Sequence, residues 1–263
     1  MPHMLFSPDG TVDSPLQAVA FICLCALGLA IAIRSLMRGA QRLGTAGLVG
    51  QFATADLLLI AALALLVPLN LIHHAHMPIT GVFRPDVGDG GLVENLTVTL
   101  MLFPVILVAS RLGSHRRSMA FGPVSLVLMC ILLVLAFGEE VSWGQHWFGF
   151  TPPEAVARTN LQEEFNLHNY ITPSTMELAY FLAGVVLMIG AARLGSLVEA
   201  SDGDTVLLPL RALLVLTAAL MGHHIFQELA ELALMVTAFL VWKRLDDGRL
   251  RFRSRPLRML AAR

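Results

Sequence analysis

Two adjacent glutamates, Glu139 and Glu140, follow a long apolar run and open the polar part of the stretch FGEEVSWGQHWFGF at 137–150. Two neighbouring carboxylates in a poorly solvated site favour sharing a proton, which is how a general acid or base arises. Ionisable side chains close to membrane depth are functional as a rule. The pair therefore indicates acid–base chemistry or the binding of a cation.

The surroundings of this pair depend on where the preceding helix ends. Carboxylates at a helix C-terminus are unfavourable by up to about 1 kcal/mol each. If the helix continues past Gly138, then Glu139, Trp143 and His146 share one face. The structural alternative is a helix end at the membrane interface, with the acids in water and with Trp143 and Trp147 as anchors.

A second polar stretch is NLQEEFNLHNY, residues 160–170. In helical register Glu164 and His168 are i, i+4 neighbours, and Gln162 and Asn166 form another such pair. A carboxylate and an imidazole one turn apart bind a metal together, or the acid orients the imidazole as a base. The alternative is an amphipathic helix that lies on the membrane with its polar side chains in water.

A third stretch, GHHIFQELAELA at 222–233, opens the last apolar run. Glu228 and Glu231 are spaced i, i+3, and His224 joins Glu228 at i, i+4 if the helix is continuous. Acids at a helix N-terminus are favoured by the helix dipole, which explains Glu228 without any function. Glu231 lies deeper in the apolar run, so we expect it to have a buried partner such as His223 or His224.

We expect the side chains of these stretches to meet in one polar site. The predicted catalytic residues are Glu139, Glu140, Glu164 and His168. The predicted ligands of a divalent metal, zinc or iron, are His146, His168, His223, His224, Glu228 and Glu231. The predicted lining residues are Trp143, Gln145, Gln162, Asn166 and Asn169.

The amino-acid composition indicates whether these residues act in water or within a membrane. The 263-residue chain is 56% hydrophobic and only 14% charged, whereas soluble domains carry about 25% charged residues. Its mean hydropathy of +0.71 is likewise typical of an integral membrane protein. The three cysteines lie in apolar runs, so no disulfide framework is expected.

The apolar runs predict an all-α, polytopic bundle of transmembrane helices. A spanning helix needs about 20 mostly apolar residues. Seven segments qualify, at 16–33, 51–72, 93–110, 119–138, 176–194, 206–223 and 226–242. The last two are almost adjacent, so their junction at HHIFQE must be tight or the helices must be broken there.

The basic residues orient this bundle through the positive-inside rule. In a seven-span chain 16 of the 18 Lys and Arg residues fall on one side, and only Arg84 and Arg158 fall on the other. The sequence therefore predicts an N-outside, C-inside topology. Eight of the nine histidines then lie on the outer side, although histidine was not used to set the orientation.

Residues 1–242 are expected to form a single transmembrane domain. In its long connection 139–175 we expect two short interfacial helices that form an outer-face lid and bring 160–170 back toward Glu139. Residues 243–263 are expected to form a basic cytoplasmic tail against anionic headgroups. The expected partners are the lipid bilayer and another membrane protein, with no nucleic acid.

The stretch EEVSWGQHWFG resembles the first motif of the CAAX-protease and bacteriocin-processing family of intramembrane glutamate proteases. Glu139, Glu140 and Trp143 match that motif, whereas Gly144 stands where the family has arginine, and the later histidine motifs are not found in their usual form. Residues 138–169 more closely resemble uncharacterised bacterial polytopic membrane proteins with a Gly-Glu-Glu-x-Ser-Trp-Gly-Gln run followed by Asn-Leu-His-Asn. These resemblances imply an intramembrane peptidase and a location in the bacterial cytoplasmic (inner) membrane, respectively.

Two classes of function remain open from the sequence. The first is a membrane-embedded hydrolase with its site at the extracytoplasmic mouth, which cleaves a membrane peptide or lipid by metal or acid–base catalysis. The second is a non-catalytic subunit or scaffold of a membrane complex, in which the polar residues dock a partner, handle protons or a cofactor, or hold the bundle together.

Overall fold

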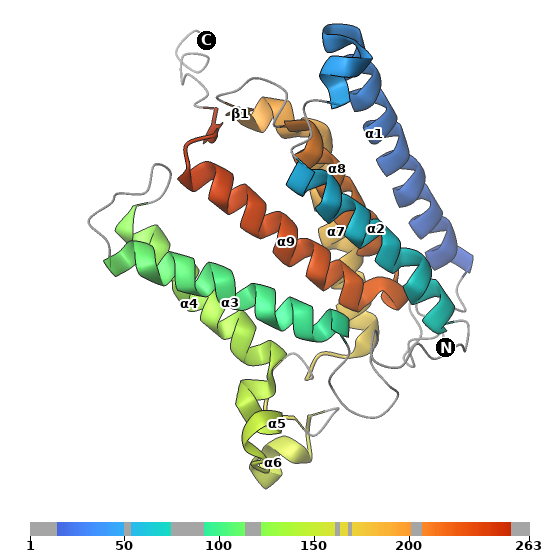
Figure 1. Ribbon diagram of the computed structural model, residues 1–263. Helices are drawn as coiled ribbons and strands as arrows, with labels where there is room; N and C mark the ends of the chain where they lie inside the picture. Colours follow the sequence, from blue (N-terminus) through green and yellow to red (C-terminus); the bar gives the residue numbers. More distant parts are fainter. Residues whose placement is uncertain are drawn as a thin grey trace, which may run out of the picture.

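The computed structural model describes residues 15–49, 54–74, 92–113, 122–160, 164–167, 170–200 and 207–253 of the chain. These residues form a bundle of long helices, which confirms the prediction of an all-α protein (Figure 1). The long helices are α1 (Pro15–Val49), α2 (Thr54–His74), α3 (Leu92–Gly113), α4 (Pro123–Glu140), α7 (Pro173–Leu197), α8 (Leu207–Leu220) and α9 (Gln227–Asp246).

Each of the seven apolar segments predicted from the sequence overlaps one of these helices. Two described stretches, Ala18–Gln41 in α1 and Ser174–Leu197 in α7, are long and apolar enough to cross a membrane. Shorter apolar stretches lie at Ile60–Leu71, Asn95–Arg111 and Leu207–Leu220. The positions of the helices therefore agree with the sequence, while the number that crosses a membrane stays a prediction.

The two ends of the bundle differ in charge. α4 finishes at the end of the bundle at which α7 and α9 begin, and we call this the glutamate end because Glu139 and Glu140 are the last residues of α4 (Figure 1). At the opposite end, the basic end, α3 and α9 finish with Arg111, Lys243 and Arg244 in their last turns. Between the ends, α8 packs against α1, α7 and α9, while α3 packs against α4 and α9.

The junction between α8 and α9 is both broken and tight, as the sequence predicts. A turn and the short 3-10 helix η4 (His224–Phe226) occupy it. Gly222 in this turn lies against α1, because a Cβ there would come within 2.9 Å of the side chains of Phe21 and Leu24. A small residue therefore lets the turn pack closely on α1.

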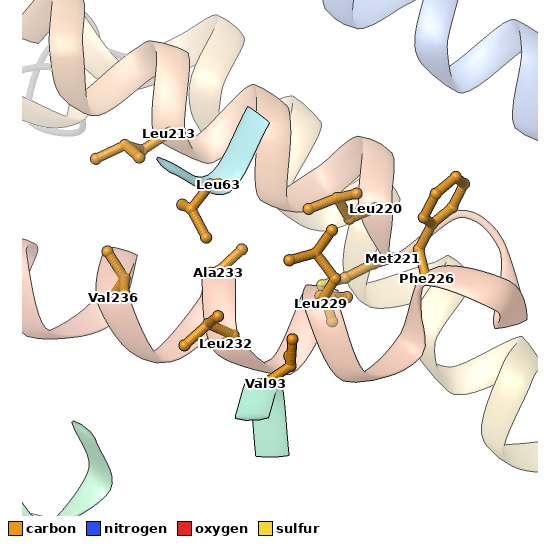
Figure 2. Close-up of a cluster of buried hydrophobic side chains, with 11 residues drawn as sticks. Leu63, Val93, Leu213, Leu220, Met221, Phe226, Leu229, Leu232, Ala233 and Val236 are labelled. Atoms are coloured by element: carbon orange, nitrogen blue, oxygen red, sulfur yellow. The ribbon is translucent and has the colours of Figure 1, made fainter. Parts of the chain in front are cut away.

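The largest buried apolar cluster is centred on α9 (Figure 2). Its members from α9 recur with helical spacing, so they share one face of the helix. These members include Leu229, Leu232, Ala233 and Val236, and they meet Leu63 from α2, Val93 from α3, and Leu213 and Leu220 from α8. Packing around this face fixes the position of the polar residues at the start of α9.

The outward faces of the peripheral helices are apolar. Ile22 of α1, Leu132 of α4 and Val186 of α7 are each more than 60% exposed. Soluble monomers rarely expose contiguous apolar surface of more than a few hundred Å². Faces of this kind are typical of helices that contact lipid.

A short antiparallel pair of strands closes the basic end. β1 (Val198–Ala200) follows α7, and β2 (Leu250–Phe252) follows α9, with Glu199 opposite Arg251. The carboxylate of Asp246 at the end of α9 also forms a 2.7 Å salt bridge with Arg111 of α3. The first part of the predicted basic tail, 243–253, is therefore folded against the bundle, and 254–263 lie outside the described residues.

Candidate functional site

The α4 helix ends with the second glutamate and does not continue through the rest of the stretch. Ser142 and Trp143 lie in the 3-10 helix η1 (Ser142–Gly144) with positive φ angles of 46° and 52°. Left-handed backbone costs a non-glycine residue roughly 1–2 kcal/mol, so this turn requires compensating contacts. Of the two alternatives for this stretch, the continuous helix that would put Glu139, Trp143 and His146 on one face does not form, because Ser142 and Trp143 have left-handed backbone conformations.

The Trp143 side chain provides one compensating contact. Its indole Nε1 donates a hydrogen bond of 2.8 Å to Glu139 Oε1. The indole ring also lies over Gly138, where a Cβ would come within 2.9 Å of the ring. Trp143 therefore folds back over the end of α4, and the glycine permits this close approach.

Four buried polar side chains, which we call the clasp, join this turn to the returning chain: Ser142, Asn160, Glu164 and Asn166. The Ser142 hydroxyl donates to Glu164 Oε2 at 2.9 Å. Asn166 Nδ2 donates to the same carboxylate oxygen at 2.8 Å and to Ser142 Oγ at 3.0 Å. Asn160 Nδ2 donates to the Asn166 backbone carbonyl at 3.0 Å. Because none of the four is more than 8% exposed, the network favours a single arrangement of the loop.

The returning segment 164–167 also reaches α4 and α5 through its backbone. The amide of Leu167 donates to Glu139 Oε2 at 2.5 Å, and the amide of Phe165 donates to Gln145 Oε1 at 2.7 Å. The segment therefore lies beside Glu139, as the sequence predicts. Its amides bind side chains rather than carbonyls of a preceding turn, and 164–167 are not helical.

This geometry overturns the helical register predicted for the second stretch. Residues 164–167 are not helical, while Gln162 and His168, the expected partners of Asn166 and Glu164, lie outside the described residues. The physical reason is local competition, because the Asn160 carboxamide oxygen accepts the Glu164 amide at 3.2 Å. Asparagine side chains compete with the backbone in this way and favour turns over helices.

The connection contains the short helices that the sequence predicts. They are α5 (Gln145–Phe148) and α6 (Glu154–Ala157). Both lie beyond the end of α4 and away from the ends of α1 and α2 (Figure 1). Their position at a membrane interface and their role as a lid stay predictions.

A second polar group, which we call the acid cluster, lies within the glutamate end and consists of Glu140, Tyr180, Gln227 and Glu231. The Tyr180 hydroxyl on α7 donates a hydrogen bond to Glu231 Oε1 on α9. Gln227 Nε2 donates to the same oxygen at 3.3 Å. Glu140 is the last residue of α4, which finishes at the same end of the bundle. α4, α7 and α9 therefore each bring an ionisable side chain to the glutamate end.

The structure gives Glu231 a hydrogen-bond partner on another helix, Tyr180, in addition to the nearby histidines that the sequence suggested. The ring of His223 packs edge-on against Phe21, with ring centroids 5.1 Å apart. Its Nδ1 accepts a hydrogen bond of 3.3 Å from the Ile225 amide. His223 thus shapes the turn between α8 and α9, next to the acid cluster.

Sequence reasoning missed two residues of α7 at this site. Tyr180 and Glu177, one turn before it, both lie within the apolar segment predicted at 176–194, and Glu177 is only 9% exposed. One oxygen of Glu228 on α9 is also inaccessible to solvent. The signal was present in the sequence, because an acid and a tyrosine three residues apart interrupt the apolar run 176–194.

Some predicted site residues fall outside the described part of the chain. They are Gln162, His168 and Asn169, together with the side chains of His146 and His224. Among the residues that the structure describes, no group of three or more His, Cys, Asp and Glu side chains is placed to hold a metal ion. The predicted zinc or iron site stays a prediction.

No family model, curated protein or solved structure matches this chain. The resemblances of the motif at 138–169 therefore stay predictions, and the function is argued from the geometry.

Proposed function

We propose that the seven long helices cross a bacterial cytoplasmic (inner) membrane, with the N-terminus and the glutamate end on the extracytoplasmic side. The apolar outward faces of the helices support a lipid surrounding. The basic residues at the ends of α3 and α9 support a cytoplasmic location for the opposite end. Ionisable groups of the acid cluster would then lie at or just below the outer membrane interface.

We further propose that the acid cluster is a hydrolytic site that acts on a membrane peptide or lipid. The observation that carries this proposal is the hydrogen bond from Tyr180 to Glu231, at the end of the bundle where α4 finishes with Glu140. Polar side chains within a membrane bundle are costly and are kept mainly where they serve a function. A carboxylate beside an oriented hydroxyl group provides both a base and a hydrogen-bond donor.

In the proposed reaction Glu140 takes a proton from water as the water oxygen attacks the carbonyl carbon of an ester or amide. Tyr180 turns its only O–H from Glu231 to the substrate oxygen that becomes negatively charged, and donates a hydrogen bond to it. When the tetrahedral intermediate collapses, the bond from carbon to the leaving group breaks. The protonated Glu140 then returns its proton to the leaving alcohol or amine. Water is the only co-reactant.

The sequence predicted Glu139 and Glu164 as catalytic. In this proposal they do not react but position the loop and Glu140. Both oxygens of Glu139 accept hydrogen bonds, from Trp143 and from the Leu167 amide. Glu164 is buried within the clasp. These two carboxylates hold the loop against the end of α4 and so fix the position of the neighbouring Glu140.

Water labelled with oxygen-18 allows hydrolysis to be detected even when the substrate is not identified. The protein is reconstituted into vesicles of bacterial phospholipid that contain single-span membrane peptides, and mass spectrometry detects labelled carboxylate products. We expect label incorporation to fall by about 10²–10⁴-fold in Glu140→Gln. Glu154→Gln, at an exposed position on α6, is the matched control and should retain wild-type turnover. The absence of labelled product, or equal turnover in Glu140→Gln, would refute the hydrolase.

A non-catalytic subunit of a membrane complex is the second candidate, and the clasp favours it. Buried polar side chains often hold helical membrane proteins together, and the clasp engages Glu164 in this way. In this case Glu140→Gln should lower the thermal midpoint in detergent, and no hydrolysis should be detected. Mild extraction from the native membrane should then recover the protein in a larger complex.

A further inference from the structure

Exposed apolar side chains gather on the connection between α4 and α7. Phe148 and Leu167 are the most exposed, at 79% and 72% of their surface. The others are Trp143, Phe150, Phe165, Tyr170 and Ile171. We call these side chains the loop patch.

Specific contacts hold the loop patch outward. The rings of Phe150 and Phe165 meet edge to face with centroids 6.0 Å apart. Trp143 and the Leu167 backbone bind the two oxygens of one carboxylate, that of Glu139. The clasp lies in the same segment and is buried. The exposure of the patch is therefore part of an ordered structure, since buried hydrogen bonds maintain it.

The loop patch continues directly from surfaces that face outward on the bundle. It begins immediately after α4 and ends immediately before α7. Both helices expose large apolar side chains, including Leu132 and Val186. Figure 1 shows α5 and α6 to one side of the bundle at the glutamate end, rather than over α1 and α2. In a membrane, the glutamate end would lie at the level at which the hydrocarbon core meets the lipid headgroups.

The residue types of the patch fit this level. Tryptophan, tyrosine and phenylalanine are favoured where one end of a side chain meets apolar chains and the other meets water. Between residues 141 and 171 the sequence has no lysine and a single arginine, Arg158. That arginine pairs with Glu154 on α6, and both side chains are about three-quarters exposed. α6 therefore supplies a hydrated charged surface beside the apolar one.

We propose that the loop patch inserts into the interfacial region of the outer phospholipid leaflet, with α6 remaining in water. The clasp would then hold an interfacial anchor at the end of α4 and set the depth of Glu140. This inference rests on the membrane-spanning part of the proposed function and is independent of hydrolysis. A protein partner that covers the patch is the competing outcome.

Quenching of a fluorescent label tests this placement in vesicles that contain only phospholipid and this protein. Cysteines replace Phe148, Glu154 or Leu132, one at a time, in a chain whose Cys23, Cys25 and Cys130 are changed to alanine. Each label is exposed to iodide in water, to lipids with a doxyl group near the headgroup, and to lipids with a doxyl group near the bilayer centre. A thermal midpoint close to that of the wild type confirms that each labelled chain is folded.

The three positions separate the possible outcomes. We expect the label at 148 to be quenched several-fold more by the shallow doxyl lipid than the label at 154, and several-fold less by iodide. We expect the label at 132 to respond to the deep doxyl lipid. Equal iodide quenching at 148 and 154, with 132 still in the bilayer, would overturn the loop-patch proposal alone and would leave a protein partner. Iodide quenching at 132 would overturn the membrane topology as well.

Discussion

Ser142 donates a 2.9 Å hydrogen bond to Glu164, a residue 22 positions further along the chain, and both side chains are buried. The bond closes a loop that begins where α4 ends. Asn166 donates to the same carboxylate oxygen at 2.8 Å, so two donors share one acceptor. Removal of that acceptor would leave both donors buried, which is costlier than the loss of an exposed contact.

Glu164→Ala is therefore expected to open the loop locally while the helices remain folded. The loss of a buried acceptor costs about 1–3 kcal/mol. Hydrogen exchange of the amides in 142–167 should accelerate by roughly tenfold or more, because each 1.4 kcal/mol of opening free energy is a factor of about ten. Exchange measured by mass spectrometry on the protein in detergent checks this, with the core of α9 as internal reference.

Two further variants control the Glu164 prediction. Glu164→Gln keeps an acceptor oxygen and should accelerate exchange less than the alanine variant. Glu154→Ala removes an exposed carboxylate from the same connection, and it should change exchange little, because exposed ion pairs contribute about 0–1 kcal/mol. Unchanged exchange in Glu164→Ala would show that the clasp does not hold the loop.

The sequence predicted the helices well because length and apolarity are local properties. It also placed 164–167 near Glu139, since a connection between two ends at one side of a bundle must return there. It could not predict the left-handed turn at Ser142 and Trp143, because neither is a residue type that favours positive φ. Long-range hydrogen bonds stabilise that turn, and these bonds are not encoded in residue spacing.

The sequence identified only part of the acid cluster, for a different reason. Helical spacing shows which residues share a face of one helix, but not which face of another helix lies opposite. Glu231 was identified as needing a buried partner, yet Tyr180 lies 51 positions away on α7. The histidines at 223 and 224 were considered because they are close in sequence, whereas helix packing brings Tyr180 to Glu231 from a different helix.

Gly184 and Gly190, both on α7, form a matched pair for testing helix packing. A Cβ at Gly184 would lie 2.8 Å from the Ala218 carbonyl oxygen of α8, whereas a Cβ at Gly190 would meet nothing within 4 Å. Small residues permit close approach of helix backbones in membranes. Gly184→Ala is expected to destabilise the protein by about 1–3 kcal/mol through overpacking. Gly190→Ala should be neutral or stabilising by up to about 1 kcal/mol, since alanine favours helix.

Thermal midpoints in one detergent check the glycine pair. We expect a lower midpoint for Gly184→Ala and no decrease for Gly190→Ala. If both variants have the wild-type midpoint, α7 and α8 do not pack as closely as the structure shows.

Arg211 of α8 connects three helices near the basic end. Its Nε donates to the Ala191 carbonyl of α7 at 3.0 Å, and its Nη1 donates to Ser35 Oγ of α1 at 3.1 Å. Lysine has no planar fork and cannot reproduce both bonds in the same geometry. Arg211→Lys should therefore lower the thermal midpoint more than Ser35→Ala, which removes one acceptor.

The control for Arg211 is Arg193→Lys on the exposed side of α7, which should leave the midpoint unchanged. In the double variant Arg211→Lys with Ser35→Ala, the two effects should be less than additive, because both changes remove the same hydrogen bond. Full additivity would mean that the bond between Arg211 and Ser35 contributes nothing to stability.

Metal removal separates the acid–base site from a metal centre. The proposed reaction at Glu140, Tyr180 and Glu231 needs only water, so hydrolysis should persist after exhaustive treatment with a chelator. The metal content of protein purified without metal resin, measured by elemental mass spectrometry, provides the independent readout. Near-stoichiometric zinc or iron that is lost in both Glu140→Gln and His168→Ala, together with activity lost on chelation, would replace the acid–base proposal with a metalloenzyme. Retention of turnover in metal-free, folded protein would assign the base to a glutamate and remove the need for histidine ligands.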